Sequence, residues 1–162
     1  MEIISAPEPI TTAHILEGFD CGVPVLSEWL IRQSLVNEHS RASRTFVVAS
    51  DMRVAGYYSL ATGSILRREA PGKIRRKMPE SIPVMVLARL VVALPWQNKG
   101  LGAGLLQDAL LRTLAVADHA GIRALIVHAL SAEAKGFYIR FGFVVSPLND
   151  MTLMLRLEGL QP

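Results

Sequence analysis

Residues 97–104 are Gln-Asn-Lys-Gly-Leu-Gly-Ala-Gly, and their surroundings predict a strand, a glycine turn and a helix. An apolar run at residues 84–96 precedes the octet, and an amphipathic stretch at residues 101–119 follows it. The first backbone N–H groups of a helix have no intrahelical partner and lie at the positive end of the helix dipole. Glycines there let an anion approach the bare backbone closely. The octet therefore predicts a pyrophosphate cradle.

The remaining periodicity predicts an α/β protein with one mixed sheet and helices on both faces. A stretch of consecutive apolar residues at 84–93, between Pro83 and Pro95, indicates a central strand that is covered on both sides. The alternation of helical and strand patterns favours this layered arrangement. We expect helices at 24–40, 101–119 and 132–141, strands at 45–50, 53–62, 84–93, 124–130, 143–146 and 151–157, and a further strand at 2–5.

The length and composition of the chain fit one domain, residues 1–162, in the cytoplasm. An apolar share of 51% over 162 residues is ample for one core. No apolar stretch approaches the roughly 20 residues of a membrane span, and residues 1–10 lack a basic signal-peptide start. The single cysteine, Cys21, suits a reducing compartment. The four histidines have no ligand spacing, so we expect neither a metal nor a membrane.

The positive charge of the chain comes from one short segment, residues 67–77. Six of the 17 Lys and Arg residues lie there with a single acid, so the segment carries +5 and the rest of the chain −2. A loop of this charge density can hold a phosphate backbone, or it can be a solvated linker that keeps the protein soluble. Its basic residues are Arg67, Arg68, Lys73, Arg75, Arg76 and Lys77.

Three phosphate ligands compete for the octet. A Walker A loop needs a lysine after its last glycine and then Ser or Thr, but Lys99 precedes Gly100. A dinucleotide fingerprint needs Gly-x-Gly-x-x-Gly, and glycines at 100, 102 and 104 have another spacing. The third ligand is coenzyme A, because Gln97-x-x-Gly100-x-Gly102 resembles the Gln/Arg-x-x-Gly-x-Gly/Ala loop of the GNAT N-acetyltransferases.

A second motif strengthens this resemblance. Residues 131–138 are similar to the GNAT pattern Asn-x-x-Ala-x-x-x-Tyr, with Ser131 in place of Asn, and Gly142-Phe143 follows them as in that family. The two motifs cover residues 84–143. The resemblance implies a GNAT fold, with a mostly antiparallel sheet splayed at the central strand, and acetyl-CoA as the cosubstrate. It implies coenzyme contacts at Leu90, Val91, Val92, Gln97, Asn98, Lys99, Gly100, Leu101, Gly102, Ala103, Lys135 and Phe137.

The same resemblance implies that Tyr138 protonates the leaving thiolate, although a core tyrosine that packs the short helix is an alternative. No Asp or Glu lies on the strand where many GNAT enzymes keep a general base. This absence favours an acceptor amine of low pKa, such as the α-amino group of an aminoacyl ester, over a lysine side chain.

Further segments resemble the GNAT toxins of bacterial toxin–antitoxin pairs. That resemblance implies acetylation of aminoacyl-tRNA, a block of translation, a homodimer and neutralisation by a ribbon-helix-helix antitoxin. Residues 67–77 would then bind tRNA phosphates. The similar segments are Ala6-Pro7-Glu8-Pro9, Arg44-Thr45-Phe46-Val47-Val48, residues 56–63, Ile82-Pro83-Val84 and Leu87-Ala88-Arg89-Leu90.

Several residues and functions keep two interpretations. Arg89, inside an apolar strand, either binds a substrate phosphate or pairs with a core carboxylate. The apolar face at Trp29 and Leu30 is expected in the core, with a partner surface as the alternative, and His128 is expected to be a satisfied core histidine. Lys135 either reaches a coenzyme A phosphate or lies in solvent, and solvent is the favoured position. The alternative functions are acetylation of a protein N-terminus or small amine, and a non-catalytic module that binds coenzyme A or a partner.

Overall fold

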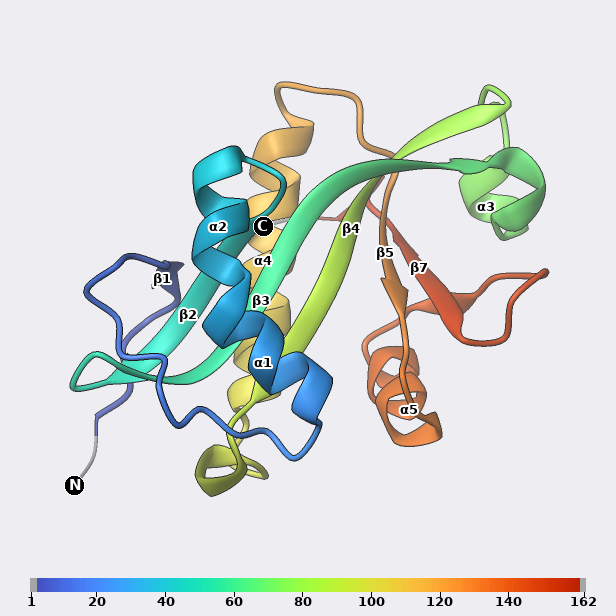
Figure 1. The fold of residues 1–162 in the computed structure, drawn as a ribbon. Helices are drawn as coiled ribbons and strands as arrows, with labels where there is room; N and C mark the ends of the chain where they lie inside the picture. The colour runs from blue at the N-terminus through green and yellow to red at the C-terminus, as the bar shows by residue number, and fades with distance from the viewer. Residues whose placement is uncertain (1–2, 161–162) are drawn as a thin grey trace. The chain divides into compact units, whose positions relative to one another are not determined.

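The computed structural model describes residues 3–160, with seven strands and five α-helices in that range (Figure 1). Their bounds are β1 Glu8–Pro9, α1 Pro24–Arg32, α2 Ser34–Ser40, β2 Arg44–Ser50, β3 Arg53–Leu66, α3 Gly72–Arg75, β4 Ser81–Val92, α4 Leu101–Ala117, β5 Ala124–His128, α5 Ala132–Arg140, β6 Val144–Val145 and β7 Thr152–Arg156. Short 3-10 turns at Arg67–Glu69 and Leu94–Trp96 precede α3 and the glycine octet.

The strands form one mixed sheet in the order β1-β2-β3-β4-β5-β7-β6. The pairs β1–β2, β2–β3, β5–β7 and β6–β7 are antiparallel, whereas β4 and β5 are parallel. The predicted mixed, mostly antiparallel sheet is therefore confirmed. The register of β4 with β5 runs from Val84 opposite Ala124 to Leu87 opposite Val127, and the last five residues of β4 lie beyond it.

The chain divides into two compact units. Within the described residues, the first unit contains 3–61 and 88–109, and the second contains 62–87 and 110–160. That residues 1–162 form one domain stays a prediction.

In the first unit, helices cover both faces of β2 and β3, with α1 and α2 on one side and the start of α4 on the other (Figure 1). Val47 and Tyr57 lie opposite each other in the β2–β3 ladder, so their side chains share one face of the sheet, and they belong to a buried cluster with Leu30 of α1. On the opposite face, Gly56 lies against α4. A Cβ there would come within 3.1 Å of both Leu105 Cδ1 and Val91 O, so a side chain at this position would require its neighbours to shift by a few tenths of an ångström.

The prediction of one helix at 24–40 is wrong, because α1 ends at Arg32 and α2 begins at Ser34. The hydroxyl of buried Ser34 donates to the Leu30 carbonyl at 2.5 Å. Such a bond to the preceding turn competes with the helical ladder and bends helices. Apolar spacing alone does not reveal this break, because the pattern continues across it.

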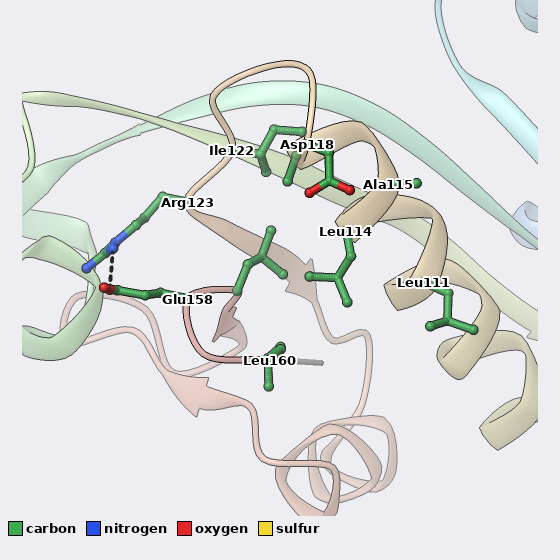
Figure 2. A pocket seen from close by; sticks show the side chains of 10 residues that line it. Leu111, Leu114, Ala115, Asp118, Ile122, Arg123, Glu158 and Leu160 are labelled. Atoms are coloured by element: carbon green, nitrogen blue, oxygen red, sulfur yellow. Dashed lines mark hydrogen bonds and ion pairs between the residues drawn. The ribbon is translucent and has the colours of Figure 1, made fainter. Parts of the chain in front are cut away.

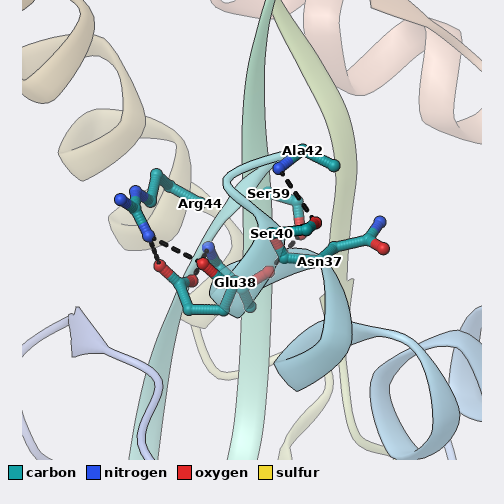
Figure 3. Close-up of polar contacts among 7 residues, drawn as sticks. Asn37, Glu38, Ser40, Ala42, Arg44 and Ser59 are labelled. Carbon is teal, nitrogen blue, oxygen red and sulfur yellow. Dashed lines mark hydrogen bonds and ion pairs between the residues drawn. The ribbon is translucent and has the colours of Figure 1, made fainter.

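Glu38 of α2 fixes that helix to β2 (Figure 3). Its carboxylate accepts from the Arg44 guanidinium at 2.5 Å and from the Thr45 backbone N–H at 2.9 Å. The Thr45 hydroxyl is buried and lies 2.8 Å from that of Ser59 on β3. The carboxylate thus satisfies the Thr45 backbone N–H and the Arg44 guanidinium at the start of β2.

In the second unit, α3 covers the sheet through one buried side chain, Ile74. It packs in a cluster with residues of β4, β5 and β7, and α5 packs against β7. The cluster is Ala70, Ile74, Ile82, Val84, Ala124, Ile126 and Met154.

Several element ends differ from the expected ones. Strand β4 begins at Ser81 and runs through Pro83, whose carbonyl accepts from Arg123 N while its missing N–H requires no partner. Helix α4 ends at Ala117, and β5 ends at His128. The His128 side chain is exposed, and its Nδ1 lies 2.8 Å from the hydroxyl oxygen of Thr152. A buried position for His128 is therefore wrong. Residues 3–5 form no strand, Glu2 lies outside the described residues, and the first strand is β1.

Candidate active site

The predicted site residues fall in both compact units: residues 89–103 in the first, and residues 67–77 and 135–138 in the second.

Gln97 fastens the start of the octet to its surroundings. Its side-chain nitrogen donates to Val92 O at 2.9 Å and to Cys21 O at 3.0 Å, and its backbone N–H donates to Leu94 O at 3.3 Å. An amide nitrogen has two protons, so both donors of the side chain are in use. Gln97 therefore shapes the loop, and the donors left for an anion come from residues after it.

The loop that follows has the backbone of an anion cradle. Asn98 and Gly100 have φ of 62° and 85°, and α4 then begins at Leu101. The N–H of Gly104 donates to Gly100 O at 3.2 Å, while the first N–H groups of such a helix have no intrahelical acceptor. Apart from its two chain neighbours, no atom of residues 3–160 lies within 4 Å of the place that a Cβ on Gly100 would take. The residues present therefore fit a pyrophosphate group.

Lys99 adds positive charge at the same place. It is exposed, and its Nζ lies 5.3 Å from the centroid of the Trp96 ring. Leu101, Gly102 and Ala103 form the first turn of α4 and are half-buried. The expected octet contacts thus lie on one continuous stretch of backbone at the positive end of a 17-residue helix.

The last residues of β4 lead into this loop. Val91 is buried, Leu90 and Val92 are half-buried, and Ala93 N donates to Ala55 O of β3 at 2.8 Å. Because the pairing of β4 with β5 stops at Leu87, residues 88–92 lie beyond the parallel ladder. This agrees with the predicted splay of the central strand.

Arg89 stacks on an aromatic ring. Its guanidinium carbon lies 3.8 Å from the centroid of the Trp29 ring, and no described carboxylate pairs with it. Burial lowers the pKa of Arg89, and neighbouring Tyr57 opposes this effect. The alternative of a paired core arginine is therefore wrong. Leu30 lies in the core as expected, whereas half-buried Trp29 packs against the core and also supports Arg89.

In the second unit, α5 presents Tyr138. The Ser131 hydroxyl caps the helix by accepting a hydrogen bond from Ala134 N at 3.1 Å. Ser131 stands at the position of the asparagine in the family pattern. The Tyr138 ring is buried between Phe137 and Phe143, with ring centroids 5.2 and 5.4 Å away. Burial raises the pKa of Tyr138 to about 12.

The Tyr138 hydroxyl is the unusual part of this packed side chain. No residue among 3–160 forms a hydrogen bond with this hydroxyl. Its oxygen is nevertheless not fully buried. The oxygen therefore keeps contact with solvent while the ring is enclosed. Of the other α5 residues, Lys135 and Phe137 are half-buried, so Lys135 is less exposed than expected.

The basic segment is folded rather than an open loop. A 3-10 turn at Arg67–Glu69 and α3 occupy most of it, and its two buried side chains are Ala70 and Ile74. The Ser146 hydroxyl donates to Glu69 O at 2.6 Å, and Arg67 Nη1 donates to Met78 O at 3.2 Å. Its six predicted basic residues are all exposed: Arg67, Arg68, Lys73, Arg75, Arg76 and Lys77.

Arg123, which the sequence did not single out, holds this segment in place. Its guanidinium donates to Ile74 O and Lys73 O, both at 3.0 Å, and to Glu158 at 2.9 Å. No local pattern identifies it, because its partners lie 49 and 50 residues earlier. It also borders a pocket of about 430 Å³ beside α4 that contains none of the predicted site residues (Figure 2).

Two features are absent from residues 3–160. Within them, no three or more His, Cys, Asp or Glu side chains gather in a way that could hold a metal ion. Nor does that part of the chain contain a helix long and apolar enough to cross a membrane.

Comparison with known proteins agrees with this geometry. The family model of the acetyltransferase (GNAT) domain matches residues 22–151, so the chain belongs to the GNAT acetyltransferases. A protein named tRNA-acetylating toxin, from Mycobacterium tuberculosis, is 44% identical over 95% of this chain and 93% of its own.

Two solved structures carry the comparison further. AtaT complexed with acetyl-methionyl-tRNAfMet is 26% identical, with a TM-score of 0.88 over 95% of each chain. AtaTR bound with AcCoA is 27% identical, with a TM-score of 0.83 over 96% of this chain and 94% of that one. The GNAT fold and the acetyl-CoA-dependent acetyltransferase class predicted from the two sequence motifs are confirmed.

Proposed function

We propose that this protein transfers the acetyl group of acetyl-CoA to the α-amino group of an aminoacyl-tRNA and blocks translation as the toxin of a toxin–antitoxin pair. The observation that carries the proposal is the 44% identity, over 95% of the chain, with a relative named tRNA-acetylating toxin. The AtaT structure with acetyl-methionyl-tRNAfMet supports the same acceptor class.

The first unit would hold the coenzyme. The N–H groups of Gly100, Leu101, Gly102 and Ala103 would bind the pyrophosphate, helped by the charge of Lys99 and the loop shape fixed by Gln97. Backbone groups of Leu90, Val91 and Val92 would hold the pantetheine and the acetyl oxygen. When bound, acetyl-CoA supplies the acetyl group as a thioester.

Tyr138 would act as the general acid. Because its pKa is raised to about 12, the hydroxyl is protonated throughout the neutral range and can deliver its proton at the sulfur. Its solvent-accessible oxygen and its lack of a described hydrogen-bond partner support this role over a purely structural one. The acceptor amine would react as the free base, which an α-amino group supplies near neutral pH.

The second unit would bind the acceptor. The six exposed basic residues of the 67–77 segment lie on a folded, anchored backbone, which suits contacts with tRNA phosphates. We also infer a cytoplasmic homodimer that a ribbon-helix-helix antitoxin neutralises, as the family resemblance implies.

The decisive test is incubation of the purified protein with acetyl-CoA and a mixture of charged tRNAs, followed by mass spectrometry of the aminoacyl products. We expect N-acetyl-aminoacyl-tRNA with the wild type and a large loss of product with Tyr138→Phe. Acetylation of free amines or peptides alone would contradict the tRNA assignment.

A further inference from the structure

Three side chains of the first unit form a continuous stack. The Trp29 and Tyr57 rings are 6.0 Å apart and inclined by only 15°, and the Arg89 guanidinium lies 3.8 Å from the centroid of the Trp29 ring. The Tyr57 hydroxyl donates to Leu26 O at 2.6 Å, which ties this ring to α1. Tyr57 is fully buried, so the base of the stack is rigid.

This arrangement leaves the edge of the Arg89 guanidinium available. Stacking uses the planar face of the group, whereas its five N–H donors lie around the edge. No hydrogen-bond or ion-pair partner of Arg89 exists among the described residues, although the side chain is half-buried. A half-buried, unpaired guanidinium of fixed orientation is costly to keep without a ligand, because a charge in such a place needs an opposite charge or acceptors.

We propose that Arg89 is a phosphate-binding residue and that Trp29 and Tyr57 are the positioning residues that aim its edge at two phosphate oxygens. A fork of parallel N–H donors matches such a pair of oxygens, and a lysine ammonium does not. Arg89 directly precedes residues 90–92, which the proposed function assigns to the pantetheine and acetyl group.

Two ligands could supply the phosphate. Both are substrates in the proposed function, on which this inference rests. One is the phosphodiester backbone at the acceptor end of tRNA, and the other is a phosphate of acetyl-CoA. The basic segment at residues 67–77 would bind tRNA phosphates through several flexible, exposed side chains. Arg89 would instead bind one phosphate in a fixed orientation.

The test measures equilibrium binding of deacylated tRNA and, separately, of acetyl-CoA to the full chain. The variants are Arg89→Gln, Arg89→Lys and Trp29→Leu. We expect Arg89→Gln to weaken one ligand about tenfold, with Arg89→Lys intermediate. For tRNA, the slope of log affinity against log salt should also fall by about 0.7–1, as for one lost phosphate contact.

Positioning by Trp29 has its own readout. Trp29→Leu should weaken the same ligand in the wild-type background but not in the Arg89→Gln background, because its effect passes through the guanidinium. Arg32→Gln, on the exposed last turn of α1, removes an equal charge and should change either affinity less than twofold.

The outcomes separate the two ligands and the two proposals. Weaker tRNA binding assigns the site to the acceptor, and weaker acetyl-CoA binding assigns it to the coenzyme. Unchanged binding of both ligands in a folded Arg89→Gln protein, or equal losses with Arg32→Gln, would overturn the inference. A wild-type protein that acetylates no charged tRNA would instead refute the proposed function, without affecting these binding data.

Discussion

Tyr138 joins a buried ring to an accessible hydroxyl, and the two parts have separate consequences. Replacing it with phenylalanine keeps the ring contacts with Phe137 and Phe143 and removes only the proton donor. We expect kcat to fall about 10²–10⁴-fold, the usual contribution of a general acid, while the dissociation constant of acetyl-CoA stays the same. Steady-state kinetics and calorimetry would measure these two quantities.

A matched control for this variant lies on the following turn. Phe141→Leu changes an exposed aromatic residue that contacts Phe137, and it should alter kcat less than twofold. If Tyr138→Phe retains wild-type kcat, the hydroxyl is not the acid.

The same hydroxyl makes stability depend on alkaline pH. A tyrosine whose pKa is raised from 10 to about 12 by burial stabilises the fold below pH 10 and loses that contribution as the pH rises toward 12. Between pH 8 and 11.5, the free energy of unfolding of the wild type should therefore fall by about 2 kcal/mol more than that of Tyr138→Phe. Urea titrations at the two pH values would measure this difference, and parallel losses would contradict it.

Individual residues were predictable where their role depends on sequence neighbours. Tyr138 and the octet glycines belong to local motifs, so their positions follow from spacing. The side chain of Gln97 donates to the carbonyl of Cys21, 76 residues away. The Trp29 ring on which Arg89 stacks belongs to a helix some 60 residues earlier. Because one sequence carries no record of such long-range contacts, these partners required the structure.

At the scale of elements, the shape of the octet depends on the positive φ of Gly100. Gly100→Ala places a side chain at a φ of 85° and adds a methyl group where an anion would approach. We expect a loss of about 1–2 kcal/mol of stability and about tenfold weaker acetyl-CoA binding. Thermal denaturation and calorimetry would detect both effects.

Gly104 provides the control for this glycine. It lies within α4 and a Cβ there meets nothing within 4 Å, so Gly104→Ala should stabilise the helix by up to about 1 kcal/mol. Its coenzyme affinity should remain that of the wild type. Equal losses of affinity in both variants would point to a general effect of bulk near the loop.

Helix α3 is too short to be stable alone, and its position depends on Arg123. Arg123→Met removes the donors to Ile74 O, Lys73 O and Glu158 and should lower the free energy of unfolding by about 2–3 kcal/mol. The control, Arg156→Met, removes an exposed partner of the same Glu158 and should cost about 0.5 kcal/mol or less. Chemical denaturation compares the two variants.

Elements were predictable in kind, but their ends were not. The hairpin of β2 and β3 follows from β-branched runs around a two-residue turn, in which Asp51 and Met52 both have positive φ. The break at Gln33 accompanies the bond from the Ser34 hydroxyl to Leu30 O, and β4 continues through Pro83 because the Pro83 carbonyl accepts from the backbone N–H of Arg123. In both cases a polar group, which hydrophobic periodicity ignores, determines the backbone.

At the scale of the whole molecule, charge is concentrated where the acceptor is proposed to bind. Expression of the wild type should stop growth and translation, and Arg75→Glu together with Arg76→Glu should relieve this arrest. Both side chains are exposed, so the reversal should weaken tRNA binding without unfolding the protein. Growth curves and incorporation of labelled amino acid would measure the effect.

An equal reversal elsewhere tests whether position matters. Arg32→Glu together with Arg41→Glu changes two exposed residues of α1 and the end of α2. That protein should remain toxic, and the basic segment would lose its assigned role if both double variants permitted growth.

The buried thiol of Cys21 offers a way to observe motion in the N-terminal layer. It is the only cysteine of the chain, and its Sγ lies 3.2 Å from Ser27 Oγ and 3.4 Å from Val23 O. A thiol reagent can reach it only when this segment opens transiently, so the labelling rate, compared with that of an unfolded peptide, gives the free energy of local opening. The natural sequence therefore contains its own single-site reporter of opening beside α1.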